Sequence, residues 1–299
     1  MSKDASFLGA VRTIAADIGF TEGPVWTGRS VIVTSITRGE LREVSLGGGP
    51  SRVVAKPGGG PNGLAYESRT GTTWVAQNGR VHMPHRSGVA DRRPGIQSIV
   101  DGEVQQPLTV TTGAPNDCVI GPDGRLWFTE PDGDPHGPGQ RVGRVWAWDP
   151  STGSRELQLE TDGYPNGLAF GADPDRLFIA ETRYGRVREF SVDGGLREVS
   201  RVTLERGFPD GLAVAADGTL FVAGTSSGTV EIFGPDGVLR ASLDLGADSM
   251  PTNVCFAGDR LDQLVVTVAR GGRVLALDCE LPGLELPAAL RSLDSEVSA

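Results

Sequence analysis

Short apolar segments alternate with turns rich in Gly, Pro, Asn and Asp along nearly the whole chain of 299 residues. At intervals of roughly forty to fifty residues, a polar turn leads directly into an apolar segment with the character of a strand. The six turns are Glu22-Gly23-Pro24, Pro61-Asn62-Gly63, Pro115-Asn116-Asp117, Pro165-Asn166-Gly167, Pro209-Asp210-Gly211 and Pro251-Thr252-Asn253. This period is typical of a β-propeller with one four-stranded blade per repeat. The sequence therefore predicts an all-β, six-bladed β-propeller of four antiparallel strands per blade, formed by residues 1–299 as a single domain.

The second strand of each expected blade is dense in β-branched and aromatic residues, as a strand buried between neighbouring blades should be. These strands are Val31–Ser35, Thr73–Gln77, Leu126–Glu130, Leu177–Glu181, Leu220–Gly224 and Leu264–Val268. A third strand is recognisable in five repeats, at Glu40–Leu46, Arg144–Trp148, Arg186–Phe190, Thr229–Phe233 and Arg273–Leu277. The five tryptophans are expected in the core between blades. Phe7–Ala16 precedes the first repeat, and we expect it to add a strand to the last blade and close the ring.

Strand direction predicts which loops share a face with the polar turns. If each first strand leads away from its polar turn, the second strand returns, so the loop that follows it lies beside the turns. Two of these loops are long, Asn78–Pro94 and Pro131–Val142. They contain all three histidines, which are His82, His85 and His136. Loops on a rigid scaffold often carry binding residues, so these two are expected to form walls around the site. Pro84 argues against the helix that a zinc-binding His82/His85 pair would need.

Composition and charge exclude several classes of partner. The net charge is −10, and Lys and Arg form no stripe that could follow a phosphate backbone, so we expect no nucleic-acid partner. No window has the apolar length of a membrane span, and Met1–Ile18 lacks the apolar core of a signal peptide. Cysteine is scarce and has no zinc-like spacing, which favours the cytoplasm and argues against thiol catalysis. The cysteines are Cys118, Cys255 and Cys279.

The polar turns are expected to converge on the propeller axis and form a ring of oxygen donors. The ring residues are Glu22, Asn62, Asn116, Asn166, Asp210 and the pair Thr252-Asn253. Carboxylate and amide oxygens suit calcium, magnesium or manganese. Asn and Asp are also ordinary turn formers, so each turn alone allows a purely structural explanation. Glu22 is a poor turn former and is therefore the most informative member. Glu130 and Glu181 end second strands on the same face, where each could line the pocket or accept hydrogen bonds from residues of the site. The alternative is a structural carboxylate that is solvated or paired with an arginine.

Five stretches in this order resemble the senescence marker protein/gluconolactonase/luciferin-regenerating enzyme family of six-bladed propellers. They are Thr21-Glu22-Gly23-Pro24-Val25-Trp26, Ala114-Pro115-Asn116-Asp117, Phe178-Ile179-Ala180-Glu181-Thr182, Pro209-Asp210-Gly211-Leu212-Ala213 and Thr252-Asn253-Val254-Cys255-Phe256. The resemblance implies one divalent metal at the axial mouth, held by Glu22, Asn166 and Asp210, with Asn116 close to the metal or to the substrate. It also implies that Asp210 acts as general base on sugar lactones or related cyclic esters. The chain departs from the family at Ala114, where similar vertebrate members carry an arginine, and at Thr252.

Together these features predict a metal-dependent hydrolase that opens a lactone by attack of water, with a small molecule as its partner. Ca²⁺ is the ion expected first, and Zn²⁺, Mg²⁺ and Mn²⁺ are alternatives. The substrate-binding residues are expected to be Asn62, Asn116, Glu130 and His136. Direct attack by water is favoured because the sequence shows no Ser-His-acid constellation. Two other readings stay open at this point, another metal-assisted enzyme (a phosphotriester hydrolase, isomerase or lyase) and a non-catalytic ligand-binding propeller.

Overall fold

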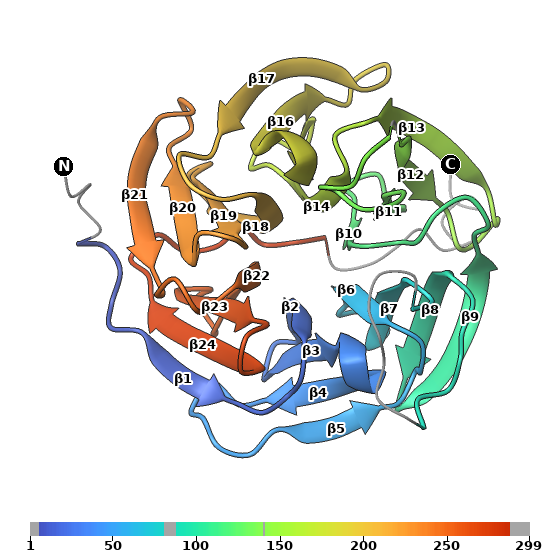
Figure 1. Cartoon of the computed structure of the whole chain (residues 1–299), viewed down its shortest axis with the longest axis horizontal. Helices are drawn as coiled ribbons and strands as arrows, with labels where there is room; N and C mark the ends of the chain where they lie inside the picture. Colours follow the sequence, from blue (N-terminus) through green and yellow to red (C-terminus); the bar gives the residue numbers. More distant parts are fainter. Residues whose placement is uncertain (1–5, 81–87, 140, 288–299) are drawn as a thin grey trace.

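The computed structural model describes residues 6–80, 88–139 and 141–287, which form a ring of six four-stranded antiparallel sheets (Figure 1). The first three blades are β2(Thr21–Trp26), β3(Val31–Ser35), β4(Glu40–Val44), β5(Arg52–Ala55); β6(Pro61–Glu67), β7(Thr72–Gln77), β8(Gly95–Val100), β9(Glu103–Thr109); and β10(Cys118–Ile120), β11(Leu126–Glu130), β12(Gly143–Trp148), β13(Arg155–Thr161). The next two are β14(Pro165–Phe170), β15(Arg176–Glu181), β16(Arg186–Ser191), β17(Arg197–Thr203); and β18(Pro209–Val214), β19(Leu220–Gly224), β20(Thr229–Phe233), β21(Leu239–Asp244). The sixth contains β22(Pro251–Ala257), β23(Gln263–Val268) and β24(Arg273–Asp278). The predicted six-bladed propeller is confirmed.

The fourth strand of the sixth blade comes from the other end of the chain. Strand β1(Arg12–Ala15) pairs antiparallel with β24, with Arg12 opposite Ala276 and Thr13 opposite Leu275. Figure 1 shows this blue strand lying on the outer edge of the red sheet. The expected closure of the ring by Phe7–Ala16 is therefore confirmed, and both ends of the repeat array are joined within one sheet.

The inner strands agree closely with the sequence prediction, whereas of the outer strands only β1 was expected from the sequence. All six predicted second strands are present, with starts shifted by at most one residue. The third strand of the second blade, β8, was missed because it follows a long loop and lacks the Gly-Arg-Val start of its equivalents. The fourth strands β13 and β17 are largely exposed, so little apolar alternation marks them.

Within the described residues, the apolar core is divided into six clusters, one between each pair of adjacent blades. Trp74 of β7 meets Trp148 of β12 edge to face, with ring centroids 5.8 Å apart. Trp127 of β11 meets Phe170 of β14 in the same way at 5.4 Å. The predicted position of the tryptophans between blades is thus confirmed for these three. Such packing makes each blade depend on both neighbours, which fixes the inner strands around a common axis.

Backbone hydrogen bonds show that the loops after the second strands lie beside the polar turns. The N–H of Ile36 donates to the carbonyl of Phe20 at 2.9 Å, directly before β2. The N–H of Thr225 does the same to Phe208, before β18, at 3.0 Å. The predicted shared face is therefore confirmed. Among the residues described, none of the helices is long and apolar enough to cross a membrane; the two that occur are the single-turn η1(Ile36–Arg38) and η2(Thr182–Tyr184).

Candidate functional site

The polar residues of the six turns lie at or next to the start of the first strands, and small residues beside them allow the strands to approach. Pairing registers shift at the start of five first strands, for example between Glu22 and Val25 and between Pro209 and Leu212. Such irregularities re-aim side chains at strand ends. A Cβ on Gly63 would collide with Asp117, and one on Gly211 would collide with the Asn253 amide. Glycine at these positions therefore brings polar side chains from neighbouring blades into contact.

Three carboxylates meet near the axis, Glu22 from blade one, Asp117 from blade three and Asp210 from blade five. Glu22 and Asp117 are only 4% and 7% exposed, whereas Asp210 is half-buried. Burial, reinforced by the charge of Asp117, raises the pKa of Glu22 from 4.5 to about 8. Burial also raises the pKa of Asp117 from 3.8 to about 7. The pKa of Asp210 is raised by burial and then by the charges of Glu22 and Asp117. Three carboxylates gathered in this way attract protons or a cation.

The Asn253 amide holds two of these carboxylates together. Its Nδ2 donates to Oε2 of Glu22 at 3.2 Å and to Oδ2 of Asp117 at 3.4 Å. The same Glu22 oxygen accepts the backbone N–H of Gly23 at 2.8 Å, and Oδ1 of Asp117 accepts that of Cys118 at 2.9 Å. Both carboxylates are therefore fixed in orientation while each keeps unused acceptor capacity.

The remaining amides come from blades two, three and four, and Asn166 of blade four is the one that contacts Asp210. Nδ2 of Asn166 donates to Oγ1 of Thr182 at 3.0 Å, and its side chain also hydrogen bonds Asp210. The side chain of half-buried Asn116 is hydrogen bonded to the phenol of Tyr164. Oδ1 of Asn62 is buried and has no hydrogen-bond partner. Buried polar atoms are normally satisfied, so this orphaned oxygen is an acceptor available to a bound group.

The donor set fits a hard divalent cation. Glu22 and Asp210 supply two carboxylates on one end of the axis, and Asn116 and Asn166 supply amide oxygens, which are calcium-type ligands. Within residues 6–80, 88–139 and 141–287, no group of three His, Cys, Asp or Glu side chains is close enough to hold a metal ion by itself. A cation here would therefore need the amide oxygens as well as the carboxylates. Its positive charge would also stabilise the ionised carboxylates and so lower the three carboxyl pKa values that burial raises.

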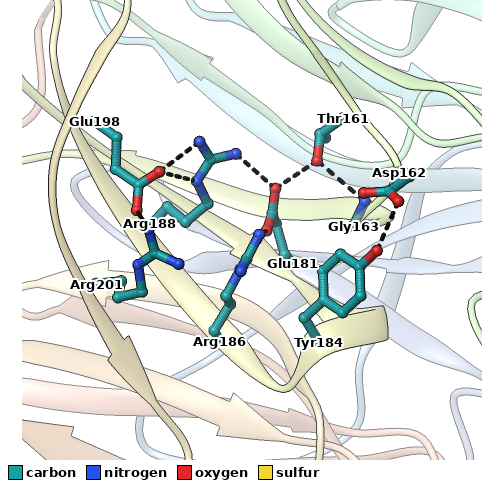
Figure 2. Close-up of polar contacts among 9 residues, drawn as sticks. All are labelled: Thr161, Asp162, Gly163, Glu181, Tyr184, Arg186, Arg188, Glu198 and Arg201. Atoms are coloured by element: carbon teal, nitrogen blue, oxygen red, sulfur yellow. Dashed lines mark hydrogen bonds and ion pairs between the residues drawn. The ribbon is translucent and has the colours of Figure 1, made fainter.

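The two glutamates that end second strands have different surroundings. Figure 2 shows Glu181 between Arg186 and Arg188, with the Thr161 hydroxyl on the same carboxylate. Its buried carboxylate accepts Nε of Arg186 at 2.6 Å and NH1 of Arg188 at 3.0 Å. Of the two readings that the sequence left open, the structure therefore shows arginine pairing for Glu181. Glu130 is fully buried and accepts the Thr112 hydroxyl, while its Oε2 has no partner.

The predicted substrate-binding residues differ in their position, and their role in binding stays a prediction. Asn62 and Asn116 lie at the ring itself. Glu130 is completely buried, and Gly113 packs directly against its side chain. These residues would have to move before the carboxylate could contact a substrate, which argues against a substrate-binding role for Glu130. His136 is exposed, and its ring centroid lies 4.4 Å from that of Phe208, directly before β18. Its loop thus reaches across to blade five. His82 and His85 lie outside the described residues.

Two residues of the site were not recognised as such from the sequence, Asp117 and Tyr164. The signal for Asp117 was a carboxylate in the place where three other turns carry glycine. Tyr164 precedes Pro165 with a φ of 59°, a left-handed conformation that is unusual for a tyrosine. Its hydroxyl lies near the charge of Asp210, which adds to the effect of burial in raising the pKa of the phenol.

The chain is similar to known lactonases in sequence and to a calcium-binding protein in structure. A family model described as SMP-30/Gluconolactonase/LRE-like region matches residues 20–270. The pentonolactonase XacC of Haloferax volcanii is 29% identical over 190 residues, covering 60% of this chain and 62% of that protein. The gluconolactonase of Zymomonas mobilis subsp. mobilis is 24% identical over 296 residues, which cover 87% of this chain and 79% of that protein. The solved structure of a calcium-binding protein, regucalcin, from Agrobacterium tumefaciens str. C58 gives a TM-score of 0.72 at 21% identity. The match covers 95% of this chain and 98% of that one.

Proposed function

Since the chain belongs to the SMP-30/gluconolactonase/LRE-like family, we propose that it is a metal-dependent hydrolase that opens a sugar lactone or a related cyclic ester. The observation that carries the proposal is the meeting of Glu22, Asp117 and Asp210 at the axis without an arginine or lysine partner in the contacts described for them. Two relatives named as lactonases support the reaction class. The proposed substrate partner is a small molecule.

The proposed cofactor is one divalent cation held by Glu22, Asn116, Asn166 and Asp210. Ca²⁺ suits an all-oxygen donor set best, and the solved relative described as calcium-binding is consistent with it. Zn²⁺, Mg²⁺ and Mn²⁺ are the alternatives to be compared. When bound, such an ion would polarise the ester carbonyl and stabilise the negative charge that develops on it.

The protein residues have distinct tasks in this proposal. Asp210 is the most accessible of the three carboxylates, so it can accept a proton from an attacking water, as a general base must. The hydrogen bond from Asn166 keeps its carboxylate in place. Asn116, held by Tyr164, is positioned to bind the ring substituents of the substrate. The contact between His136 and Phe208 would hold the loop 131–142 beside this side of the mouth.

The decisive experiment is a lactone panel followed with a pH indicator. Protein stripped of metal is assayed alone and after reloading with Ca²⁺, Zn²⁺, Mg²⁺ or Mn²⁺, beside Asp210→Asn treated in the same way. We expect acid release from at least one lactone, restored by one of the ions and lost in the variant. Ion-independent hydrolysis, or an Asp210→Asn variant as active as the wild type, would refute the proposal. Metal binding with turnover only of phosphotriesters would instead support the other hydrolase reading.

A further inference from the structure

A largely apolar cavity of about 430 Å³ follows the propeller axis below the carboxylates. The first strands run away from the polar ring, and their later residues form the wall. The wall includes the large apolar or aromatic side chains of Trp26, Tyr66, Phe170, Val214, Phe256 and Leu286. The cavity therefore reaches toward the end of the axis opposite the long loops. Its size lies in the range of sites that bind small organic molecules.

The C-terminal part of the described chain crosses the far mouth of this cavity. The N–H of Gly283 donates to the carbonyl of Leu261 at 2.8 Å, and that of Leu284 donates to Val214 at 3.1 Å. A Cβ on Gly283 would collide with the Phe256 ring, so this segment lies directly against the cavity wall. Figure 1 shows the red segment leaving the ring of sheets and running to the centre. Leu284, Leu286 and Pro287 thus complete an apolar rim.

The polar and charged side chains of the lining are Thr27, Tyr66, Ser68, Asp117, Asn253 and Glu285. Asp117 and Asn253 form the inner end, directly beneath Glu22. Among the residues that line the cavity within the described chain there is no lysine or arginine. An anion entering it would meet a buried carboxylate and lose its hydration without a partner. A donor N–H or O–H would instead find unused acceptor capacity on the Asp117 carboxylate.

We propose that this axial cavity is a second binding site, for an uncharged small molecule with an apolar body and one hydrogen-bond donor directed at Asp117. Water is a poor occupant of most of this space, since a buried water needs two to four polar partners. The site lies on the other side of Glu22 from the open mouth near Asp210 and His136. The inference does not depend on lactone hydrolysis, which is measured separately.

N-phenyl-1-naphthylamine is a suitable probe because it is uncharged, has one N–H, and becomes fluorescent in apolar surroundings. Titrated with the full chain, it should give a saturable increase in fluorescence with one site per molecule. The sulfonated analogue 8-anilinonaphthalene-1-sulfonate should bind at least about tenfold more weakly, because its charge must be desolvated beside Asp117. The N-methylated amine, which lacks the N–H, should also bind several-fold more weakly. Equal binding of the sulfonate would overturn the assigned chemistry.

Two variants locate the probe. Ala169→Leu puts extra volume into the wall, and Leu286→Glu puts a charge at the mouth, so each should weaken binding at least about tenfold. Leu286 is 56% exposed, so its variant should fold even if the core variant does not. Val238→Glu is the matched control, since Val238 is 51% exposed and does not line the cavity. Absence of saturable binding to the wild type, or unchanged binding in Leu286→Glu, would overturn the proposal.

Discussion

Nδ2 of Asn253 in the sixth blade donates to Oε2 of Glu22 in the first blade at 3.2 Å, so the two ends of the repeat array meet at the axis. The sequence separation of these residues is 231 positions. The same amide contacts Asp117 of the third blade. One side chain therefore orients two buried carboxylates, and the propeller closure determines the geometry of the proposed metal site.

Removal of either charge from the Glu22/Asp210 pair should abolish turnover. Glu22→Gln and Asp210→Asn keep the shape of the side chain but remove a negative charge. That charge is needed to bind the cation and, at Asp210, to accept the proton from water, so kcat should fall at least about 100-fold. Steady-state assays on the preferred lactone measure this. Glu103→Gln, at an exposed position, should leave kcat unchanged. Full activity in either ring variant would show that the mechanism is wrong.

The stability of metal-stripped protein should decrease as the pH rises. The folded-state pKa values are about 8 for Glu22 and about 7 for Asp117, above ordinary values of 4.5 and 3.8. Because the folded chain binds these protons more tightly, their stabilising effect is complete below about pH 4 and is lost through about pH 8. Tm should therefore fall across this interval.

Added calcium should reverse that trend, because a cation competes with the same protons. The increase in Tm on adding calcium should be larger at pH 8 than at pH 5. Differential scanning calorimetry at both pH values, with and without the ion, measures the difference. Asp117→Asn should flatten the pH dependence of the metal-stripped protein. A calcium effect that is larger at pH 5 would contradict the proposal that the ion binds beside the ionised form of these carboxylates.

The repeat allowed much of this site to be predicted from sequence, for a geometric reason. Glu22, Asn166 and Asp210 occupy equivalent turns, and equivalent positions in a propeller converge on its axis. Asp117 was not predicted as a site residue because it directly follows Asn116. The sequence does not show which of two adjacent polar residues faces the axis. Both residues precede β10, which begins at Cys118, so the alternation of side chains along a strand does not decide between them. Side-chain contacts between blades, such as the hydrogen bond of Tyr164 with Asn116, cannot be predicted from the repeat period, because the period does not show which loop residues of two blades meet.

The environment of Glu181 shows another limit of the sequence. Its place at the end of a second strand on the site face was read correctly, but the same pattern describes a ligand and a structural carboxylate. Glu181 lies opposite Arg186 in the hairpin, and Arg188 comes two residues later on the same face of the strand. Strand register therefore decides its pairing, and register cannot be read from residue types alone.

Glu181→Gln should destabilise the protein while leaving the chemistry largely intact. Its carboxylate is buried against two arginines, so loss of its charge breaks the ion pair with Arg186 and leaves Arg188 with its pair to Glu198. The expected loss is about 3 kcal/mol in the free energy of unfolding. Glu160→Gln is the matched control, since Glu160 pairs with Arg144 at the surface and should cost less than about 1 kcal/mol. Urea denaturation compares them; equal losses would show that burial does not strengthen the Glu181 pairs.

Tyr164→Phe should reduce catalysis without unfolding the propeller. Phenylalanine preserves the buried ring but removes the hydroxyl that is hydrogen bonded to the Asn116 side chain. The freed amide would lose its orientation toward substrate and cation, so kcat/KM should fall about tenfold, the usual effect of losing one hydrogen bond of about 1.4 kcal/mol. The calcium affinity should weaken as well, which a purely structural role would not require.

Tyr184→Phe provides the control for this substitution. The Tyr184 hydroxyl donates to Oδ2 of Asp162 at 2.7 Å on the surface, outside the ring of polar side chains. Its removal should therefore change neither kcat/KM nor calcium affinity, although it deletes the same atom from the same residue type. Steady-state kinetics and calcium titration by calorimetry are compared for both variants, with Tm as the measure of folding. A Tyr164→Phe protein that matches Tyr184→Phe in all three quantities would show that Asn116 is oriented by other contacts.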